Sequence, residues 1–182
     1  MPRNRTKGRI LVATPVLSDP NFDRTLVFML EDNDDGSLGV VLNNPSDTTV
    51  GATVPELAWI AGADDPVFVG GPVSPEVALA IAECPGECAG FTPVVHDIGT
   101  LDLSEGEASS VDIGRGRLYS GYSGWAPGQL QAELDAGAWF VVDLHPDDAF
   151  MAETVGLWER VLRRQRGEIA WFANYPIAPE VN

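Results

Sequence analysis

The sequence predicts an α+β fold in a single domain, and three observations carry this expectation. Short apolar runs rich in Ile, Leu, Val and Phe are mixed with stretches of helical character, without the regular strand–helix alternation of a doubly wound sheet. No linker, internal repeat or low-complexity block divides the 182 residues. A chain of this length with 45% hydrophobic residues can bury a core. We therefore expect one domain over residues 1–182, with residues 1–7 as a disordered tail.

In chain order, the first apolar runs predict buried strands over residues 10–13, 26–30 and 38–42. The second and third runs flank a polar tract that ends in Gly36, which is typical of a β-hairpin. A short helix is expected over residues 53–60, because Pro55 falls in its first turn.

The middle of the chain predicts a strand over residues 66–69 and then a helix over residues 74–83. This helix would begin with Ser74 as a cap, Pro75 at the first helical position and an acidic residue after it. Residues 85–115 are less regular, with strand-like pieces near 91–95 and 98–101.

The last part of the chain predicts a helix over residues 129–135, closed by Gly137, and a strand over residues 138–142. The longest helix is expected over residues 146–165. Trp158, Val161 and Leu162 share one face of it, as in an amphipathic helix.

The net charge of −16, from 11 Lys plus Arg against 27 Asp plus Glu, disfavours direct binding of DNA or of an anionic membrane. Between Arg24 and Arg115 there are 16 carboxylates and no Lys or Arg. A solvated acidic surface is expected there, and a docking face for a basic partner is the alternative. The remaining candidates for nucleic-acid contact are Arg160, Arg163 and Arg164, which also suit the negative end of a helix dipole.

The longest apolar run, residues 77–82, is too short to span a membrane, and the apolar stretch near the N-terminus is too short for a signal peptide. The sequence therefore predicts a cytoplasmic protein. Its only lysine, Lys7, is not part of a phosphate-binding loop.

Several site patterns fail on inspection. If Gly36 took the sixth position of a calcium loop, Leu42 would stand where the bidentate carboxylate is required, so a solvated turn is expected. The stretch 121–125 has Trp125 where a nucleophile elbow needs Gly. His145 precedes Pro146-Asp147-Asp148, which favours a helix start over a catalytic role.

Cys84 and Cys88 are too few for a disulfide framework, and a structural zinc site would lack a fourth ligand. We expect ordinary small residues here, with a reactive thiol pair as the alternative. Arg24, the one cation near Asp19 and Asp23, is expected to form an ion pair that fixes the loop 19–21, with anion recognition as the alternative.

Four segments together resemble the YqgE/AlgH family of bacterial proteins. They are GRILVATPVLSDPNFDRTLVF (8–28), GSLGVVLNNP (36–45), FVGGPVS (68–74) and LYSGYSGWAPGQLQAELDAGAW (118–139). The resemblance implies an α+β fold with a bifurcated mixed β-sheet, partly closed into a small barrel and surrounded by helices. It brings no established activity, metal or cofactor. Family members are often described as transcriptional regulators, but no helix-turn-helix is evident here.

Residues at the matching positions are mostly Gly, Pro, aromatic or amide. They are Pro15, Asp19, Pro20, Phe22, Arg24, Gly39, Asn43, Pro45, Gly70, Gly71, Pro72, Gly121, Tyr122, Trp125, Gly128, Gln129 and Leu130. Relatives often carry Glu-His where this chain has Glu31-Asp32, and Lys or Arg where it has Asn44.

Of the matching residues, seven are candidates for a ligand-binding site: Arg24, Asn43, Gly70, Gly71, Tyr122, Trp125 and Gln129. Glycine loops allow close backbone approach, and an aromatic near an amide suits a small polar ligand. Glycines that only permit unusual turns are the alternative.

We therefore expect a regulatory or adaptor protein without enzymatic activity, binding a protein partner or a small polar ligand. The alternative is a small polar-ligand-binding protein or an enzyme that uses the Gly-rich pocket. A monomer or weak homo-oligomer is expected.

Overall fold

The computed structural model describes residues 6–104 and 113–175 and confirms the α+β class. Its strands are β1 (Arg9–Ala13), β2 (Leu26–Asn33), β3 (Gly36–Val41), β4 (Pro45–Thr49), β5 (Pro66–Val69), β6 (Val73–Glu83), β7 (Phe91–Val95), β8 (Ile98–Leu101), β9 (Gly116–Trp125) and β10 (Trp139–Asp143). Its helices are α1 (Val50–Thr53), α2 (Ala58–Ala61), α3 (Gln129–Asp135), α4 (Pro146–Phe150) and α5 (Leu157–Arg163), with 3₁₀ helices η1 (Pro20–Phe22), η2 (Pro55–Leu57) and η4 (Gly167–Asn174).

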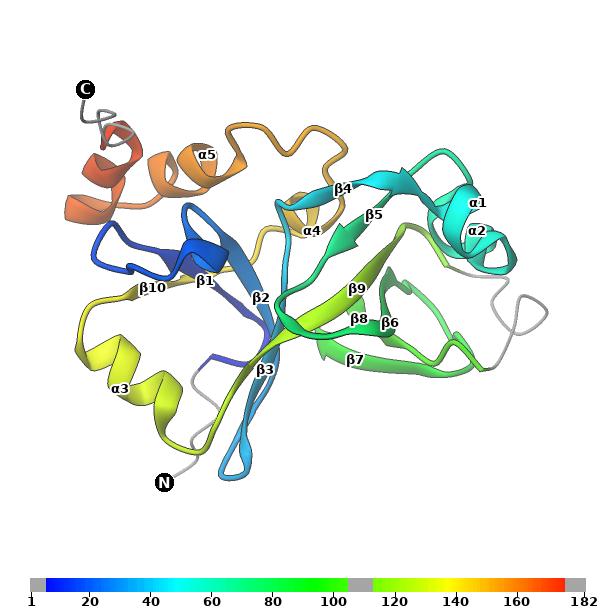
Figure 1. Ribbon diagram of the computed structural model, residues 1–182, viewed down its shortest axis with the longest axis horizontal. Helices are drawn as coiled ribbons and strands as arrows, with labels where there is room; N and C mark the ends of the chain where they lie inside the picture. Colours follow the sequence, from blue (N-terminus) through cyan, green and yellow to red (C-terminus); the bar gives the residue numbers. More distant parts are fainter. Residues whose placement is uncertain (1–5, 105–112, 176–182) are drawn as a thin grey trace.

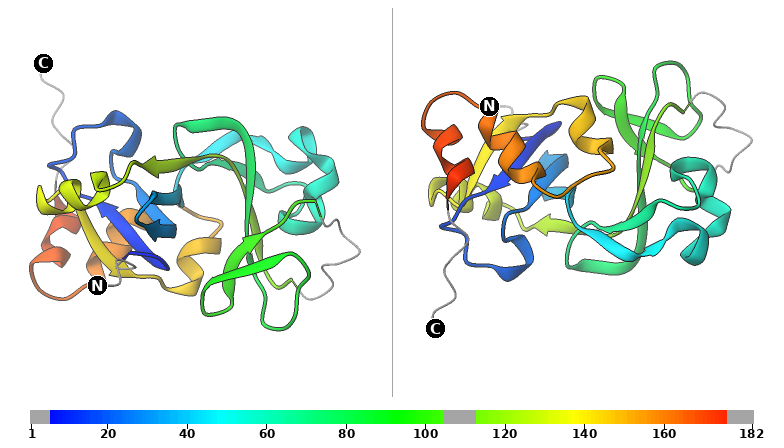
Figure 2. Two further views of the ribbon diagram at one scale, coloured as in Figure 1. Left: turned by 90° about the horizontal axis from the view of Figure 1, so that it is seen from below. Right: turned by 90° about the horizontal axis from the view of Figure 1, so that it is seen from above.

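The strands form one sheet that divides at β9. The order is β10-β1-β2-β3-β9-β6-β8-β7, while β5 pairs with both β4 and β9. Strand β9 pairs with β3 through residues 123–125 and with β5 through residues 119–120, and β6 runs along most of its length. Only the β5–β9 pairing among these is parallel. The sheet is thus mixed and bifurcated, and Figures 1 and 2 show its two arms on either side of β9, with the arm of β5 to β8 curled into a half-barrel.

The first arm, β10-β1-β2-β3, is buried on both faces. Ile10 and Val12 belong to one core cluster with Trp158 of α5, whereas Leu11 and Ala13 belong to another cluster that includes Leu130 of α3. Figure 1 shows α3 and α5 on opposite sides of these strands. Since successive strand side chains point to opposite faces, burial of both faces explains the continuous apolar runs of β1 and β2.

The second arm, formed by β5 to β8, has a smaller core of its own. Val50, Ile60, Ala80 and Leu118 are buried together there, under the short helices α1 and α2. These two helices and η2 replace the single helix expected over residues 53–60. Among the residues that the structure describes, no helix is long and apolar enough to cross a membrane.

The expected helix over residues 74–83 is wrong, because this segment is strand β6. It pairs with β9 on one side and β8 on the other, so its backbone groups are used in two ladders. Pro75 lies within the register shift between Val73 and Ala78. Because the pairing is interrupted there, the N–H that proline lacks is not needed by the ladder. Local helix-start signals are weak next to such pairing.

The long helix expected over residues 146–165 is also wrong in its middle. Helix α4 ends at Phe150, where Met151 becomes extended, and α5 starts only after Gly156, which has a φ of 73°. The expected apolar face is nevertheless buried in α5. The helix over residues 129–135 is confirmed as α3, and the hairpin is confirmed as β2 and β3.

The two cysteines are joined, so the expectation of ordinary small residues is wrong. Cys84 follows β6 and is buried, and Pro85-Gly86 turns the chain back so that Cys88 reaches it in a disulfide. The Cα–Cα distance of 6.3 Å lies within the span of such a bond.

At the N-terminal end, Thr6, placed in the tail by the sequence, is buried, and its hydroxyl donates to Asp32 at 2.7 Å. Residues 1–5 of the expected tail lie outside the described residues.

Candidate functional site

A surface cavity of about 510 Å³ lies between the β2–β3 hairpin and strand β9, and we call it the hairpin cavity. Its lining consists of Glu31, Asn33, Asp35, Gly36, Ser37, Leu38, Val73, Tyr122, Gly124 and Trp125. Pairing of residues 37–39 of β3 with residues 123–125 of β9 brings the hairpin beside the aromatic residues. The volume is in the range of ordinary ligand pockets.

The hairpin cavity is acidic. Glu31 and Asp35 are exposed carboxylates in its lining, and none of the lining residues is Lys or Arg. Asp32, one residue along, serves the fold instead, because it accepts hydrogen bonds from Thr6 and from the Ser37 hydroxyl at 2.7 and 2.8 Å. The cavity therefore offers acceptor oxygens and aromatic surface, which suits a cation or a hydrogen-bond donor.

Trp125 is held in the cavity wall by Glu133 of α3. One carboxylate oxygen of Glu133 accepts the indole N–H of Trp125 at 2.9 Å and that of Trp139 at 2.8 Å. Gln129 supports this arrangement, since its amide donates to the other oxygen of Glu133 and accepts from the Ala126 N–H, both at 3.0 Å. The polar groups of Trp125 and Gln129 thus already have partners inside the protein.

Gly70 and Gly71 allow the chain to cross β9 at very short range. A Cβ atom on Gly70 would lie 2.3 Å from the carbonyl oxygen of Gly121, and one on Gly71 would lie 2.3 Å from that of Tyr122. The Gly70 carbonyl accepts from the Val41 N–H at 2.9 Å and from the buried Ser123 hydroxyl at 3.0 Å. These contacts favour the alternative that the two glycines permit a close crossing.

Arg24 and Asn43 lie at the ends of β2 and β3 that are farthest from the hairpin turn. Arg24 forms an ion pair with Glu159 at 3.0 Å, donates to the Tyr175 carbonyl at 2.9 Å and stacks over Trp158. The expected ion pair with the loop 19–21 is therefore wrong. Asp19 instead accepts from the backbone and side chain of Asn21, because its carboxylate caps the short helix η1.

Asn43 links the two strand ends internally. Its side-chain oxygen accepts from the Leu26 N–H at 3.0 Å, and its amide donates to the Arg24 carbonyl at 2.9 Å. Of the seven candidates, Tyr122 and Trp125 line the hairpin cavity, Gln129 supports Trp125, and the other four have contacts elsewhere. Glu31, Asp35 and Glu133 were not predicted as site residues, although the first two belong to the acidic hairpin tract of the sequence.

His145 begins helix α4, as the sequence predicts. Its Nδ1 accepts a hydrogen bond from the backbone N–H of Asp147 at 3.3 Å. The backbone N–H of His145 donates to the carboxylate of Asp148 at 3.1 Å. Ser123, in the stretch compared with a nucleophile elbow, lies within β9 and is fully buried. Its hydroxyl is used in the contact with Gly70 described above.

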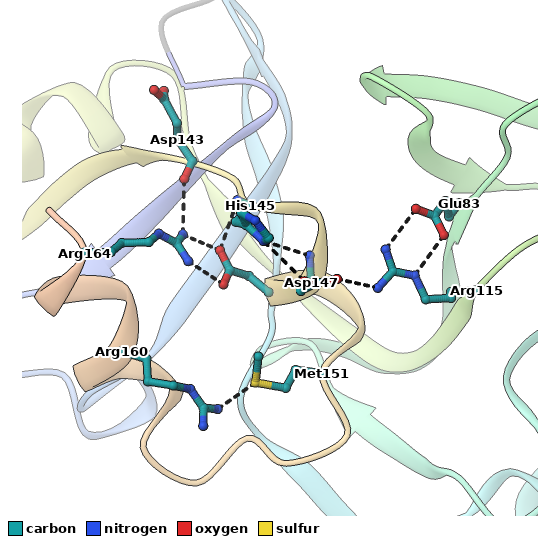
Figure 3. A network of polar contacts seen from close by, with 9 residues as sticks. Glu83, Arg115, Asp143, His145, Asp147, Met151, Arg160 and Arg164 are labelled. Atoms are coloured by element: carbon teal, nitrogen blue, oxygen red, sulfur yellow. Dashed lines mark hydrogen bonds and ion pairs between the residues drawn. The ribbon is translucent and has the colours of Figure 1, made fainter.

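A polar network around α4 joins the two arms of the sheet to α5 (Figure 3). Arg115 donates to both oxygens of Glu83 at 2.8 and 2.9 Å and to Asp147 at 2.8 Å. The hydrogen bonds from Arg115 hold the pKa of Glu83 and the pKa of Asp147 below their usual values. The pKa of Arg115 is raised in return, first by its hydrogen bond with Glu83.

Arg164, directly after α5, joins the same network, whereas Arg160 of α5 has separate contacts. Arg164 forms an ion pair with the buried carboxylate of Asp148, and Arg160 donates to the Met151 sulfur at 2.7 Å and to the Glu153 carbonyl at 2.8 Å. Arg163 is exposed. Two of the three residues considered for nucleic-acid contact thus have partners within the protein.

Comparison with known proteins gives one consistent result. The AlgH-like family model matches residues 10–170. A UPF0301 protein from Streptomyces coelicolor is 45% identical over 96% of this chain and 94% of its own, and one from Thermobifida fusca is 41% identical over 100% and 98%. These names state no activity.

Two solved structures share the fold. The crystal structure of protein DIP2367 from Corynebacterium diphtheriae has a TM-score of 0.85 and 26% identity, covering 95% of this chain and 94% of that one. The solution structure of the AlgH protein from Pseudomonas aeruginosa has a TM-score of 0.68 and 22% identity, covering 92% and 98%. At that identity the second comparison supports the fold alone.

Proposed function

Because the chain belongs to the AlgH-like family, we propose, from the chemistry of the hairpin cavity, that it is a regulatory or adaptor protein without enzymatic activity. In this proposal it binds a basic segment of a partner protein in that cavity. The supporting observation is the lining itself, in which two exposed carboxylates and two aromatic residues occur without Lys or Arg.

A lysine or arginine side chain fits this chemistry. Glu31 and Asp35 would accept charge-assisted hydrogen bonds, and the half-buried ring of Tyr122 would contact the cation or its aliphatic stem. The net charge of −16 would steer a basic partner towards the molecule and repel an acidic one.

The composition of the cavity also supports a role without catalysis. Its lining includes no His, Cys or Lys, and the hydroxyl of Ser37 donates to Asp32. His, Cys, Lys and Ser are frequent nucleophiles or general bases, and Glu31 and Asp35, whose carboxylates can also be general bases, act as binding groups in this proposal. A small polar ligand in the same cavity is the competing proposal, because Tyr122 and Trp125 were expected to bind one.

The test compares two double variants with the same change in charge. Glu31→Gln with Asp35→Asn neutralises the cavity, whereas Asp47→Asn with Glu56→Gln neutralises exposed carboxylates outside it. Binding of Lys/Arg-rich peptides is measured by fluorescence anisotropy at several salt concentrations. We expect the cavity variant to bind about tenfold more weakly, as two exposed ion pairs of up to about 1 kcal/mol each would require.

The control variant should lose much less affinity than the cavity variant. Equal losses in both would mean that only the overall charge attracts the peptides, and would contradict a specific site. Failure of wild-type protein to bind any basic peptide at low salt would also contradict the proposal. Competition by a neutral polar small molecule would favour the ligand-binding alternative.

We also propose a cytoplasmic location, the expectation from the sequence. The disulfide between Cys84 and Cys88 opposes it, because such bonds persist mainly in oxidising compartments. Alkylation of thiols in intact cells before lysis, followed by mass spectrometry, tests this point. Two alkylated cysteines are expected, and a peptide that is still cross-linked would contradict the proposal.

A further inference from the structure

Arg117 of β9 is a buried cation without an acidic partner. Only 5% of its surface is exposed, and among the described residues no Asp or Glu forms an ion pair with it. Its guanidinium donates to the carbonyls of Leu42 at 3.1 Å and Met151 at 2.6 Å and lies 3.9 Å from the centre of the Phe68 ring. A guanidinium has five N–H groups, and buried charges are costly unless they are compensated.

A small, partly open cavity of about 90 Å³ adjoins this guanidinium, and we call it the arginine pocket. It lies between the second arm and the segment after α4, and Phe68, Gly116, Arg117 and Phe150 are part of its lining. Its volume corresponds to about three water molecules. A carboxylate group or a phosphate ion is of this size, whereas a larger organic molecule is not.

Tyr119, which is not among the residues that line the arginine pocket, is a second buried polar side chain on β9. Its side chain is 1% exposed, and its hydroxyl is the one buried side-chain polar atom without a hydrogen-bond partner in the described residues. Residues 117 and 119 point to the same face of β9, and Phe68 contacts both side chains. Burial raises the pKa of Tyr119, so its hydroxyl keeps its proton at neutral pH and can donate it in a hydrogen bond.

We infer that the arginine pocket binds a small oxyanion, a carboxylate group or inorganic phosphate, through the guanidinium of Arg117. The planar guanidinium matches the paired oxygens of both anions. Asp65 lies at the exposed rim, where its negative charge would repel an anion. Neutralising Asp65 should therefore strengthen anion binding. The inference does not depend on the proposed function, because the arginine pocket and the hairpin cavity share no lining residue.

The experiment titrates the full-length protein with sodium phosphate and, separately, with sodium acetate, holding ionic strength constant with sodium chloride. Thermal unfolding and isothermal calorimetry report binding, and the two anions show whether phosphate or carboxylate is preferred. We expect at least one anion to raise Tm beyond the effect of chloride. Arg117→Lys should weaken the binding of that anion by about tenfold, since a hydrogen bond to a charged group is lost.

Tyr119→Phe keeps the ring and removes a hydroxyl that lies outside the pocket lining, so it is a control for Arg117→Lys. It should fold as stably as wild type without anion and keep the wild-type anion affinity. Asp65→Asn should bind the anion more tightly. Arg163→Lys, an exposed change outside the pocket, is the matched control and should leave binding unchanged.

Three results would overturn the inference. The first is no gain in Tm from phosphate or acetate over chloride in the wild-type protein. The second is unchanged anion affinity in Arg117→Lys, which would remove the guanidinium from the site. The third is a marked loss of stability in anion-free Asp65→Asn, which would make Asp65 the counter-ion of Arg117.

Discussion

The two halves of strand β9 lie in contrasting environments. Residues 116–120 run between β5 and β6, and Arg117, Leu118 and Tyr119 are buried there. Residues 121–125 run past the hairpin cavity; Ser123 and Trp125 are buried there too, but Tyr122 is half-buried and Gly124 is exposed. A buried polar group needs a hydrogen-bond partner in the protein or in a ligand. A polar group at an open cavity can instead form hydrogen bonds with water until a ligand binds. In the two proposals above, the same strand would serve two separate binding roles.

The largest expected effect is the difference between the two tyrosines. Tyr119→Ala would leave a cavity in the core and should lower the free energy of unfolding by about 3–5 kcal/mol. Tyr122→Ala, in the open half, should lower it by only about 1 kcal/mol. Urea unfolding of both variants measures the difference. Similar losses would mean that both halves of β9 belong to one core and would break the contrast.

A smaller effect is expected where the open half is anchored. Glu133→Ala would leave the indole N–H groups of Trp125 and Trp139 without their acceptor, and should cost about 2 kcal/mol in unfolding free energy. Glu133→Gln is the matched control, since it keeps one oxygen acceptor and should recover part of the loss. Calorimetric unfolding of both variants tests this. An alanine variant as stable as wild type would show that the carboxylate does not hold the cavity wall.

The sequence predicted the first arm well because local pattern and burial agree there. Strands β1 and β2 are buried on both faces, so each appears as an unbroken apolar run. Strand β6 was mistaken for a helix because Ser74 and Pro75 carry local start signals, while its true partners β8 and β9 are distant in the chain. Such non-local pairing leaves no trace in a short window of sequence.

The candidate site follows the same rule. Tyr122 and Trp125 were predicted as site residues through the family resemblance. That they line one cavity with Glu31 and Asp35 depends on the register between β3 and β9. Arg24 and Asn43 share the resemblance and lie elsewhere, because they tie strand ends together. Arg117 gave no signal at all, since a single arginine in a glycine-rich stretch is ordinarily exposed.

The smallest expected effect concerns Arg115, which precedes β9 and ties its buried half to β6 and α4. Glu83→Gln should lower the unfolding free energy by about 1 kcal/mol or less near pH 7, because the ion pair is partly exposed. The hydrogen bond from Arg115 lowers the folded-state pKa of Glu83 below its ordinary 4.5. The stabilisation is therefore complete above that value and is lost as the pH falls through the folded-state pKa.

The difference in unfolding free energy between wild type and Glu83→Gln should accordingly shrink on acidification, as urea unfolding across a pH series would measure. Glu76→Gln, an exposed change on the same strand that leaves Arg115 untouched, is the matched control. A difference that grew at low pH would mean that the protonated carboxyl, and not the carboxylate, is the stabilising form. In that case Arg115 would hold the buried half of β9 through Asp147 and its contact over the Phe150 ring, and α4 would be its principal anchor.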